Sequence, residues 1–150
     1  MNRRQFVLTA ASLITAGPAL SEAAAPILQV TKTPTCGCCG AWVDRMVSAG
    51  FEASVKDVDY DTLQAMKQQL GIEPHLAGCH TTKIGDYFIE GHVPAEDIRR
   101  LLKDTPVARG LTAPGMPMGS PGMDMGGAGG SYDVLLVLMD GSTRVFASHG

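Results

Sequence analysis

The sequence has no long run of lysine or arginine, and its charge is sparse and nearly balanced. Charged residues make up 18% of the 150 residues, and the formal net charge is -3. Nucleic-acid binding needs a basic patch or stripe, so we exclude a nucleic-acid partner. No pair of acidic residues suggests acid–base catalysis, and these residues suit helix caps and solvated faces: Asp44, Glu52, Asp57, Asp59 and Asp61.

A long hydrophobic run is also missing. The apolar stretch near the N-terminus ends at about residue 20 and is rich in small residues, which makes it a poor membrane span. Arg3 and Arg4 precede it, and Ala19-Leu20-Ser21 offers a cleavage site. We predict an export signal over residues 1–21 and a periplasmic mature protein with no stable membrane span; a retained anchor is the alternative. The two arginines also resemble the twin-arginine export pattern, with an ordinary secretory signal as the other route.

The remaining chain, residues 22–150, can bury one modest core, so we predict a single domain. Short β-type runs and helical spacings alternate along it until Pro106 limits the last helix. The predicted order is βαβαββα, with strands over 27–31, 51–58, 81–84 and 87–90 and helices from 41, from 59 or 61, and from 94. This order predicts an α/β, thioredoxin-like fold.

Residues 105–131 are rich in proline, glycine and methionine and are predicted to form an irregular loop. The segment after it contains β runs over 134–139 and 144–147 around Asp140-Gly141. Aspartate followed by glycine is a strong signal for a two-residue hairpin turn. We therefore expect an added C-terminal β-hairpin that extends or covers the sheet.

Three of the four cysteines lie in Cys36-Gly37-Cys38-Cys39, and the fourth is Cys79. The triplet falls where the first strand meets the first helix, and a helix N-terminus favours thiolate, which is both nucleophile and metal ligand. In the thioredoxin topology, the loop that carries Cys79 lies against this motif. A dithiol exchange enzyme needs only Cys36 and Cys39, whereas a soft metal ion benefits from every further thiolate.

We therefore predict that Cys36, Cys38, Cys39 and Cys79 form one thiolate metal site. Copper(I) is the expected ion because soft ligands in an oxidising compartment favour it, with zinc or silver as alternatives. Two structural disulfides are another possibility for an exported chain. Adjacent Cys38 and Cys39 cannot easily bond to each other, however, and a Cys36–Cys39 bridge would be reactive rather than structural.

Two histidines could complete this site. His80 adjoins Cys79 and His92 follows the fourth predicted strand, so either imidazole could ligate copper or support a ligand. A hydrogen-bonded structural role is the alternative for each. His75 and His149 are assigned to solvent and left out of the site.

The methionines of the loop are further candidates. Met123 and Met125 follow no apolar helical or strand period, so core packing explains them poorly, and their thioethers suit copper(I) or silver(I). Met116 and Met118 could also offer thioethers, or they could pack beneath a loop that covers the domain.

Four ordered motifs resemble a family long catalogued only as a domain of unknown function, whose best-described members are CopG-like periplasmic copper-resistance proteins. The motifs are TPTCGCCG over 33–40, GCHT over 78–81, EGHVP over 90–94 and GMPMGSPGM over 115–123. The resemblance implies a thioredoxin-like fold, copper bound by the four cysteines in a multinuclear copper–sulfur cluster, and a role in copper or silver tolerance.

The expected function is copper(I) binding in copper or silver homeostasis, with the metal sequestered or passed to an efflux or storage protein. Whether the protein also catalyses a reaction stays open. The alternative is a thiol–disulfide oxidoreductase that uses Cys36 and Cys39. A structural zinc domain that serves protein interaction is a third hypothesis.

Overall fold

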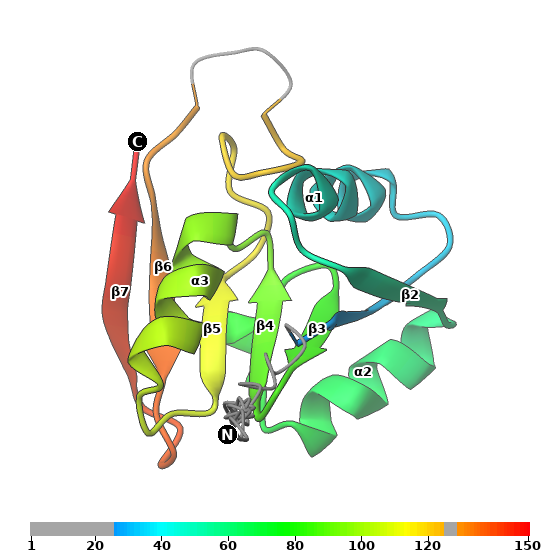
Figure 1. Cartoon of the computed structure of the whole chain (residues 1–150). Coiled ribbons are helices and arrows are strands. Elements are labelled where there is room, and N and C mark those ends of the chain that lie inside the picture. Colours follow the sequence, from blue (N-terminus) through cyan, green and yellow to red (C-terminus); the bar gives the residue numbers. More distant parts are fainter. Residues whose placement is uncertain (1–25, 125–128) are drawn as a thin grey trace, which may run out of the picture.

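A computed structural model describes residues 26–124 and 129–150 as a mixed α/β fold (Figure 1). Its sheet has seven strands in the order β2-β1-β3-β4-β5-β6-β7. The described ranges also contain three α-helices and one short 3-10 helix. The predicted export signal over residues 1–21 and Met125 lie outside the described residues.

The N-terminal half forms a parallel β-α-β unit followed by a second helix. Strand β1 (Leu28–Lys32) pairs in parallel with β2 (Ala53–Asp57), and α1 (Gly37–Ser48) connects them. Helix α1 buries Trp42 and Met46, one helical turn apart, against the sheet. Helix α2 (Tyr60–Gln69) starts where the Asp59 carboxylate accepts a hydrogen bond from the Thr62 N–H.

The next elements confirm the predicted hairpin and third helix. After the 3-10 helix η1 (Pro74–Leu76), β3 (Thr81–Ile84) runs antiparallel to both β1 and β4 (Tyr87–Gly91). The tight turn between β3 and β4 places Gly85 at a φ of +57°. Helix α3 (Ala95–Asp104) follows Pro94 and buries Ile98 and Leu101 in the core.

The prediction of an irregular loop over residues 105–131 was wrong for its first part, which contains β5 (Gly110–Ala113). This strand is fully buried and pairs in parallel with β4 and antiparallel with β6 (Tyr132–Val137). Gly110 is required there, because a Cβ at this position would collide with the Phe88 carbonyl. The predicted C-terminal hairpin is present as β6 and β7 (Thr143–His149), and β5 joins it to the rest of the sheet.

The main core lies between the sheet and helices α1 and α3. Side chains from β1, β4, β5 and β6 meet those of the two helices in one cluster, which includes Leu28, Val30, Trp42, Met46, Ile89, Ile98, Leu101, Leu111, Val134 and Leu136. Within the ranges that the structure describes, no helix is both long and apolar enough to cross a membrane.

Candidate metal centre

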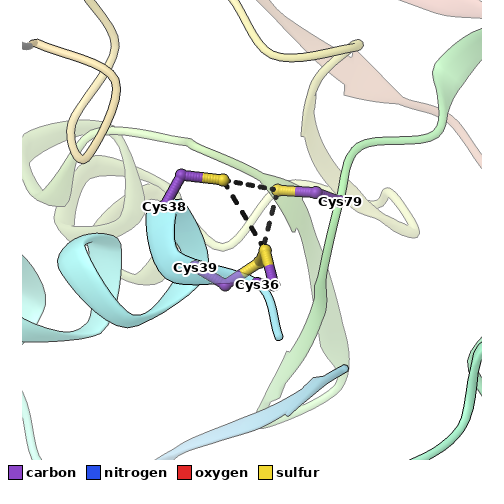
Figure 2. Close-up of side chains that lie close together, drawn as sticks. All are labelled: Cys36, Cys38, Cys39 and Cys79. Atoms are coloured by element: carbon purple, nitrogen blue, oxygen red, sulfur yellow. Dashed lines mark hydrogen bonds between the residues drawn. A yellow bond between two sulfur atoms is a disulfide. The ribbon is translucent and has the colours of Figure 1, made fainter. Parts of the chain in front are cut away.

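The four cysteine sulfurs lie together, as the predicted order of elements indicated. Cys36 is the N-cap residue of α1, Cys38 and Cys39 occupy its first turn, and Cys79 projects from the loop between η1 and β3 (Figure 2). The Sγ–Sγ distances are 3.4 Å from Cys79 to Cys39, 3.9 Å from Cys79 to Cys38, and 3.6 Å from Cys36 to Cys38. All four sulfurs lie within 4.8 Å of one another, so together they could hold a metal ion.

Two of the four sulfurs are joined by a disulfide between Cys36 and Cys39. Cys38 and Cys79 are free and half-buried, whereas Cys39 is fully buried. The arrangement therefore contains one bridge and two thiols rather than the two structural disulfides considered from the sequence. Four thiolates become available to a metal ion only when the Cys36–Cys39 bond is reduced.

His92 is fully buried and is oriented by both of its ring nitrogens. Its Nδ1 lies 2.7 Å from the Pro121 carbonyl oxygen, and its Nε2 lies 2.9 Å from the Cys79 Sγ. Because a carbonyl can only accept, Nδ1 carries the hydrogen, and in the neutral ring the Nε2 lone pair faces Cys79. Burial lowers the pKa of His92, although the bond to Pro121 opposes this effect. The neutral ring can accept from the thiol or ligate a metal ion.

His80 is also fully buried, beside Cys79. Its Nδ1 lies 3.6 Å from the Cys79 Sγ, and its Nε2 has no hydrogen-bond partner among the described residues. Burial, followed by repulsion from His92 when that ring is protonated and from the Lys67 ammonium, holds the pKa of His80 well below its usual value. Cys79, His80 and His92 form a second group whose ligand atoms lie within 4.8 Å of one another.

Cys79 thus belongs to both groups of potential ligands. Burial, reinforced by the negative charge of Cys38, raises the pKa of the Cys79 thiol to about 12. Cys79 is therefore a thiol at neutral pH in the metal-free protein. A metal ion that binds its sulfur must displace this proton.

The Pro/Gly/Met-rich segment over residues 114–124, here called the methionine loop, packs over the start of α1. The Gly122 backbone fits so closely that an added Cβ would lie 2.8 Å from the Cys38 carbonyl oxygen. Met123 is half-buried, in a turn where its N–H donates to the Ser120 carbonyl. Met116 and Met118 do not pack beneath the loop, because they are 55% and 58% exposed.

Comparison with solved structures supplies the family. A structure titled "Copper resistance protein copG- Form 1" is 35% identical, covers 83% of this chain and 98% of its own, and superposes with a TM-score of 0.77. The Form 2 structure is also 35% identical, with 84% of this chain and 99% of its own covered and a TM-score of 0.77. The chain belongs to the CopG-like family.

The family model described as "Protein of unknown function, DUF411" matches residues 76–123. That range holds Cys79, both buried histidines and Met123 of this CopG-like chain, while the Cys36–Cys39 segment precedes it. No curated protein matches the sequence significantly.

Two buried residues next to the centre were missed from the sequence. Glu90 lies on β4 and Lys67 on α2, and they form an ion pair directly behind the Cys79 loop. The sequence signal that could have identified Glu90 is its place directly after the apolar run Tyr87-Phe88-Ile89, where a buried acidic residue needs a partner. His75 is exposed as expected, but His149 is half-buried, with its Nε2 2.7 Å from the Asp97 carboxylate, so its assignment to solvent was wrong.

Proposed function

We propose that this CopG-like protein binds copper(I) in the periplasm through Cys36, Cys38, Cys39 and Cys79 in their reduced state. The observation that carries the proposal is the convergence of four sulfurs within 4.8 Å. Thiolate sulfur is a soft ligand that suits copper(I) and silver(I). The CopG structures that the chain resembles are titled as copper resistance proteins, which supports a role in copper or silver tolerance.

The donor set supports more than one copper ion per chain. Four thiolates already complete the shell of a single tetrahedral ion, yet His80 and His92 place two more nitrogen donors against Cys79. Cys79 is common to both groups, and a thiolate that bridges two ions would link them into a copper–sulfur cluster. The Nε2 of His80 has no hydrogen-bond partner among the described residues, and its Nδ1 faces the Cys79 thiol at 3.6 Å. The ring therefore has no strong partner there.

The proposal also covers the fold, the location of the protein and the methionine thioethers. The β1-α1-β2 unit and the antiparallel β3-β4 pair support a thioredoxin-like core, with β5, β6 and β7 added to it. The export signal supports the periplasmic location. The exposed thioethers of Met116 and Met118, with Met123 and Met125, would offer weaker sites for copper(I) or silver(I) outside the thiolate centre. Efflux or storage proteins are the expected recipients.

The test is an anaerobic copper(I) titration of the reduced protein, residues 22–150, against a chelator of moderate affinity, with the metal-to-protein ratio read by elemental analysis. We expect several copper ions per chain, a lower ratio for Cys79→Ser, and a lower ratio for His92→Ala. His75→Ala is the matched control, because His75 is an exposed imidazole that belongs to neither group of potential ligands. A variant lacking Met123 and Met125 tests the thioether sites.

Failure of the reduced protein to retain copper would overturn the proposal. A single ion per chain would retain copper binding but exclude the cluster. Zinc-dependent folding, seen as unfolding on addition of a zinc chelator, would instead support the structural zinc domain. The disulfide form is an internal control, since it lacks two of the four thiolates and should bind less copper.

A second function, thiol–disulfide exchange, is favoured by the Cys36–Cys39 bridge itself. Cys36 is half-exposed and lines a pocket of about 400 Å³ together with Cys79, so a partner thiolate could approach it there. Attack on the Cys36 sulfur would form a mixed disulfide and release Cys39 as the leaving thiolate. In the reverse direction, the Cys36 thiolate of the reduced protein attacks a partner disulfide, and Cys39 then attacks Cys36 to release the reduced partner. Reduction of peptide disulfides by the metal-free, reduced protein would therefore support this function, and absence of turnover would exclude it.

A further inference from the structure

A buried ion pair supports the segment that carries Cys79 and His80. Glu90 is 0% exposed and Lys67 is 2% exposed, so neither charge reaches solvent. The Lys67 ammonium donates to a Glu90 carboxylate oxygen and, over 2.8 Å, to the Thr81 hydroxyl. The Thr81 hydroxyl in turn donates to the other Glu90 oxygen at 2.6 Å. The three side chains therefore form a closed hydrogen-bonded network.

The carboxylate also holds the backbone on the other side of Cys79. The Gly78 N–H donates to the Glu90 Oε1 at 2.7 Å. Gly78 precedes Cys79 and Thr81 follows His80, so the two oxygens of Glu90 grip both ends of the Cys79-His80 dipeptide. Glu90 lies two residues before His92 on the chain, which ties the dipeptide to the segment carrying the second imidazole.

Close packing around the Glu90 carboxylate leaves the loop that carries Cys79 little room to move. A Cβ added to Gly78 would lie 2.6 Å from the Gly91 Cα, so the loop backbone rests directly on the end of β4. Thr81 also pairs with Glu90 in the β3-β4 register. Small changes in the position of the Glu90 carboxylate would therefore be passed to the Cys79 sulfur.

Core stability alone does not explain why this position holds charge. Taking an ammonium and a carboxylate out of water costs several kcal/mol per ion in general, and apolar replacements of buried pairs are often neutral or stabilising. The pair is neutral overall, and the Lys67 charge is only the smallest of the effects on the pKa of Cys79, which it lowers. What the charged pair adds here is a set of directional bonds to the residues on both sides of Cys79 and His80.

We infer that Glu90, held by Lys67, is a positioning residue that sets Cys79 and His80 against the sulfurs of α1. This inference rests on the proposed function in that the positioned groups are the proposed ligands. Glu90 belongs to neither group of potential ligands, and the Lys67 ammonium has no lone pair to give a metal ion. They act through the loop, in the manner of the groups that orient metal ligands, whose loss typically lowers metal affinity about 10–100-fold.

The test removes both charges together, because a single substitution would leave the other charge buried and unpaired. The variant is Lys67→Met with Glu90→Gln, which keeps the side-chain volumes. Val134→Ala is the control for lost stability, since Val134 is buried in the main core on β6, a strand that pairs with β5 and β7 and not with β3 or β4. Thr81→Val and Thr81→Ser form a second matched pair, of which only the serine keeps the hydroxyl that joins Glu90 to Lys67.

Two readouts are measured on folded protein. The first is copper(I) affinity by chelator competition, together with the copper–thiolate absorption spectrum. The second is the alkylation rate of the metal-free disulfide form in a Cys38→Ser background, where Cys79 is the remaining free thiol. The alkylation readout needs no copper, so it separates this inference from the proposed function.

We expect the double variant and Thr81→Val to bind copper about 10–100-fold more weakly, with an altered spectrum and faster Cys79 alkylation. Thr81→Ser should restore both readouts, and Val134→Ala should change neither. The inference is overturned if the double variant alkylates at the parent rate, or if Val134→Ala reproduces its changes. If the parent chain binds no copper, the alkylation rates alone still decide the positioning role.

Discussion

Gly122→Ala tests whether the methionine loop is packed on α1 in solution. Gly122 has a φ of +87°, and an added Cβ would lie 2.8 Å from both the Cys38 carbonyl oxygen and the Trp42 backbone nitrogen. The left-handed conformation costs an L-residue about 1–2 kcal/mol. Overpacking against backbone adds about 1–3 kcal/mol, because no side-chain rotation can relieve it. The sum is about 2–5 kcal/mol.

Gly85→Ala is the matched control for the conformational part of this cost. Gly85 also has a positive φ, +57°, but an added Cβ would meet no atom within 4 Å beyond its own chain neighbours. Its substitution should therefore cost only about 1–2 kcal/mol. The free energy of unfolding is measured by urea denaturation of the metal-free disulfide form, followed by circular dichroism.

The two variants also differ in their effect on the candidate centre. Pro121 precedes Gly122, and its carbonyl accepts the hydrogen bond that orients His92. A displaced loop would release this imidazole, so copper binding should weaken in Gly122→Ala and not in Gly85→Ala. Equal losses of stability in the two variants would refute the reasoning, because the loop would then not be packed on α1.

Two further changes test the packing of Trp42 and the titration of Tyr132. Trp42→Phe should destabilise the fold by about 2–4 kcal/mol, because it opens a cavity and removes the 2.9 Å hydrogen bond that the Trp42 Nε1–H donates to the Val93 carbonyl. A loss below about 1 kcal/mol in urea denaturation would contradict this packing. Tyr132→Phe should change the alkaline limb of stability. Burial, with the charges of Asp97, Glu96 and Asp124, raises the pKa of Tyr132 to about 12 from 10.0. The unfolded chain therefore loses this proton first, and the parent should lose stability between pH 10 and 12 relative to the variant. If the urea midpoints of the parent and the variant changed equally between pH 9 and pH 11, the raised pKa of Tyr132 would be contradicted.

Local patterns predicted the elements whose own sequence favours them. Trp42 and Met46 mark the buried face of α1, and Asp59 caps α2. Strand β5 could not be found in this way, because its four residues are buried on both faces and carry no alternation. Its strand conformation comes from β4 and β6 on either side.

The candidate centre was likewise predictable only where it depends on local patterns and on the order of elements. The order of elements brought Cys79 to the triplet, because the first helix and the third strand meet at one end of the sheet. The partner of the His92 Nδ1 could not be predicted, since it depends on how a Pro/Gly-rich loop folds back over α1. The same holds for Lys67 and Glu90, which are 23 residues apart in sequence.

The sulfurs of Cys39 and Cys79 come from positions 40 residues apart, so the complete centre exists only in the folded chain. An ion that binds the folded but not the unfolded state stabilises the fold by about 4 kcal/mol when its concentration is a thousand times its dissociation constant. Loaded molecules would then survive proteases that digest empty, reduced ones. Supply of the ion would thereby set how much of the protein persists as well as how much is filled, and digestion rates at graded ion concentrations would reveal this dependence.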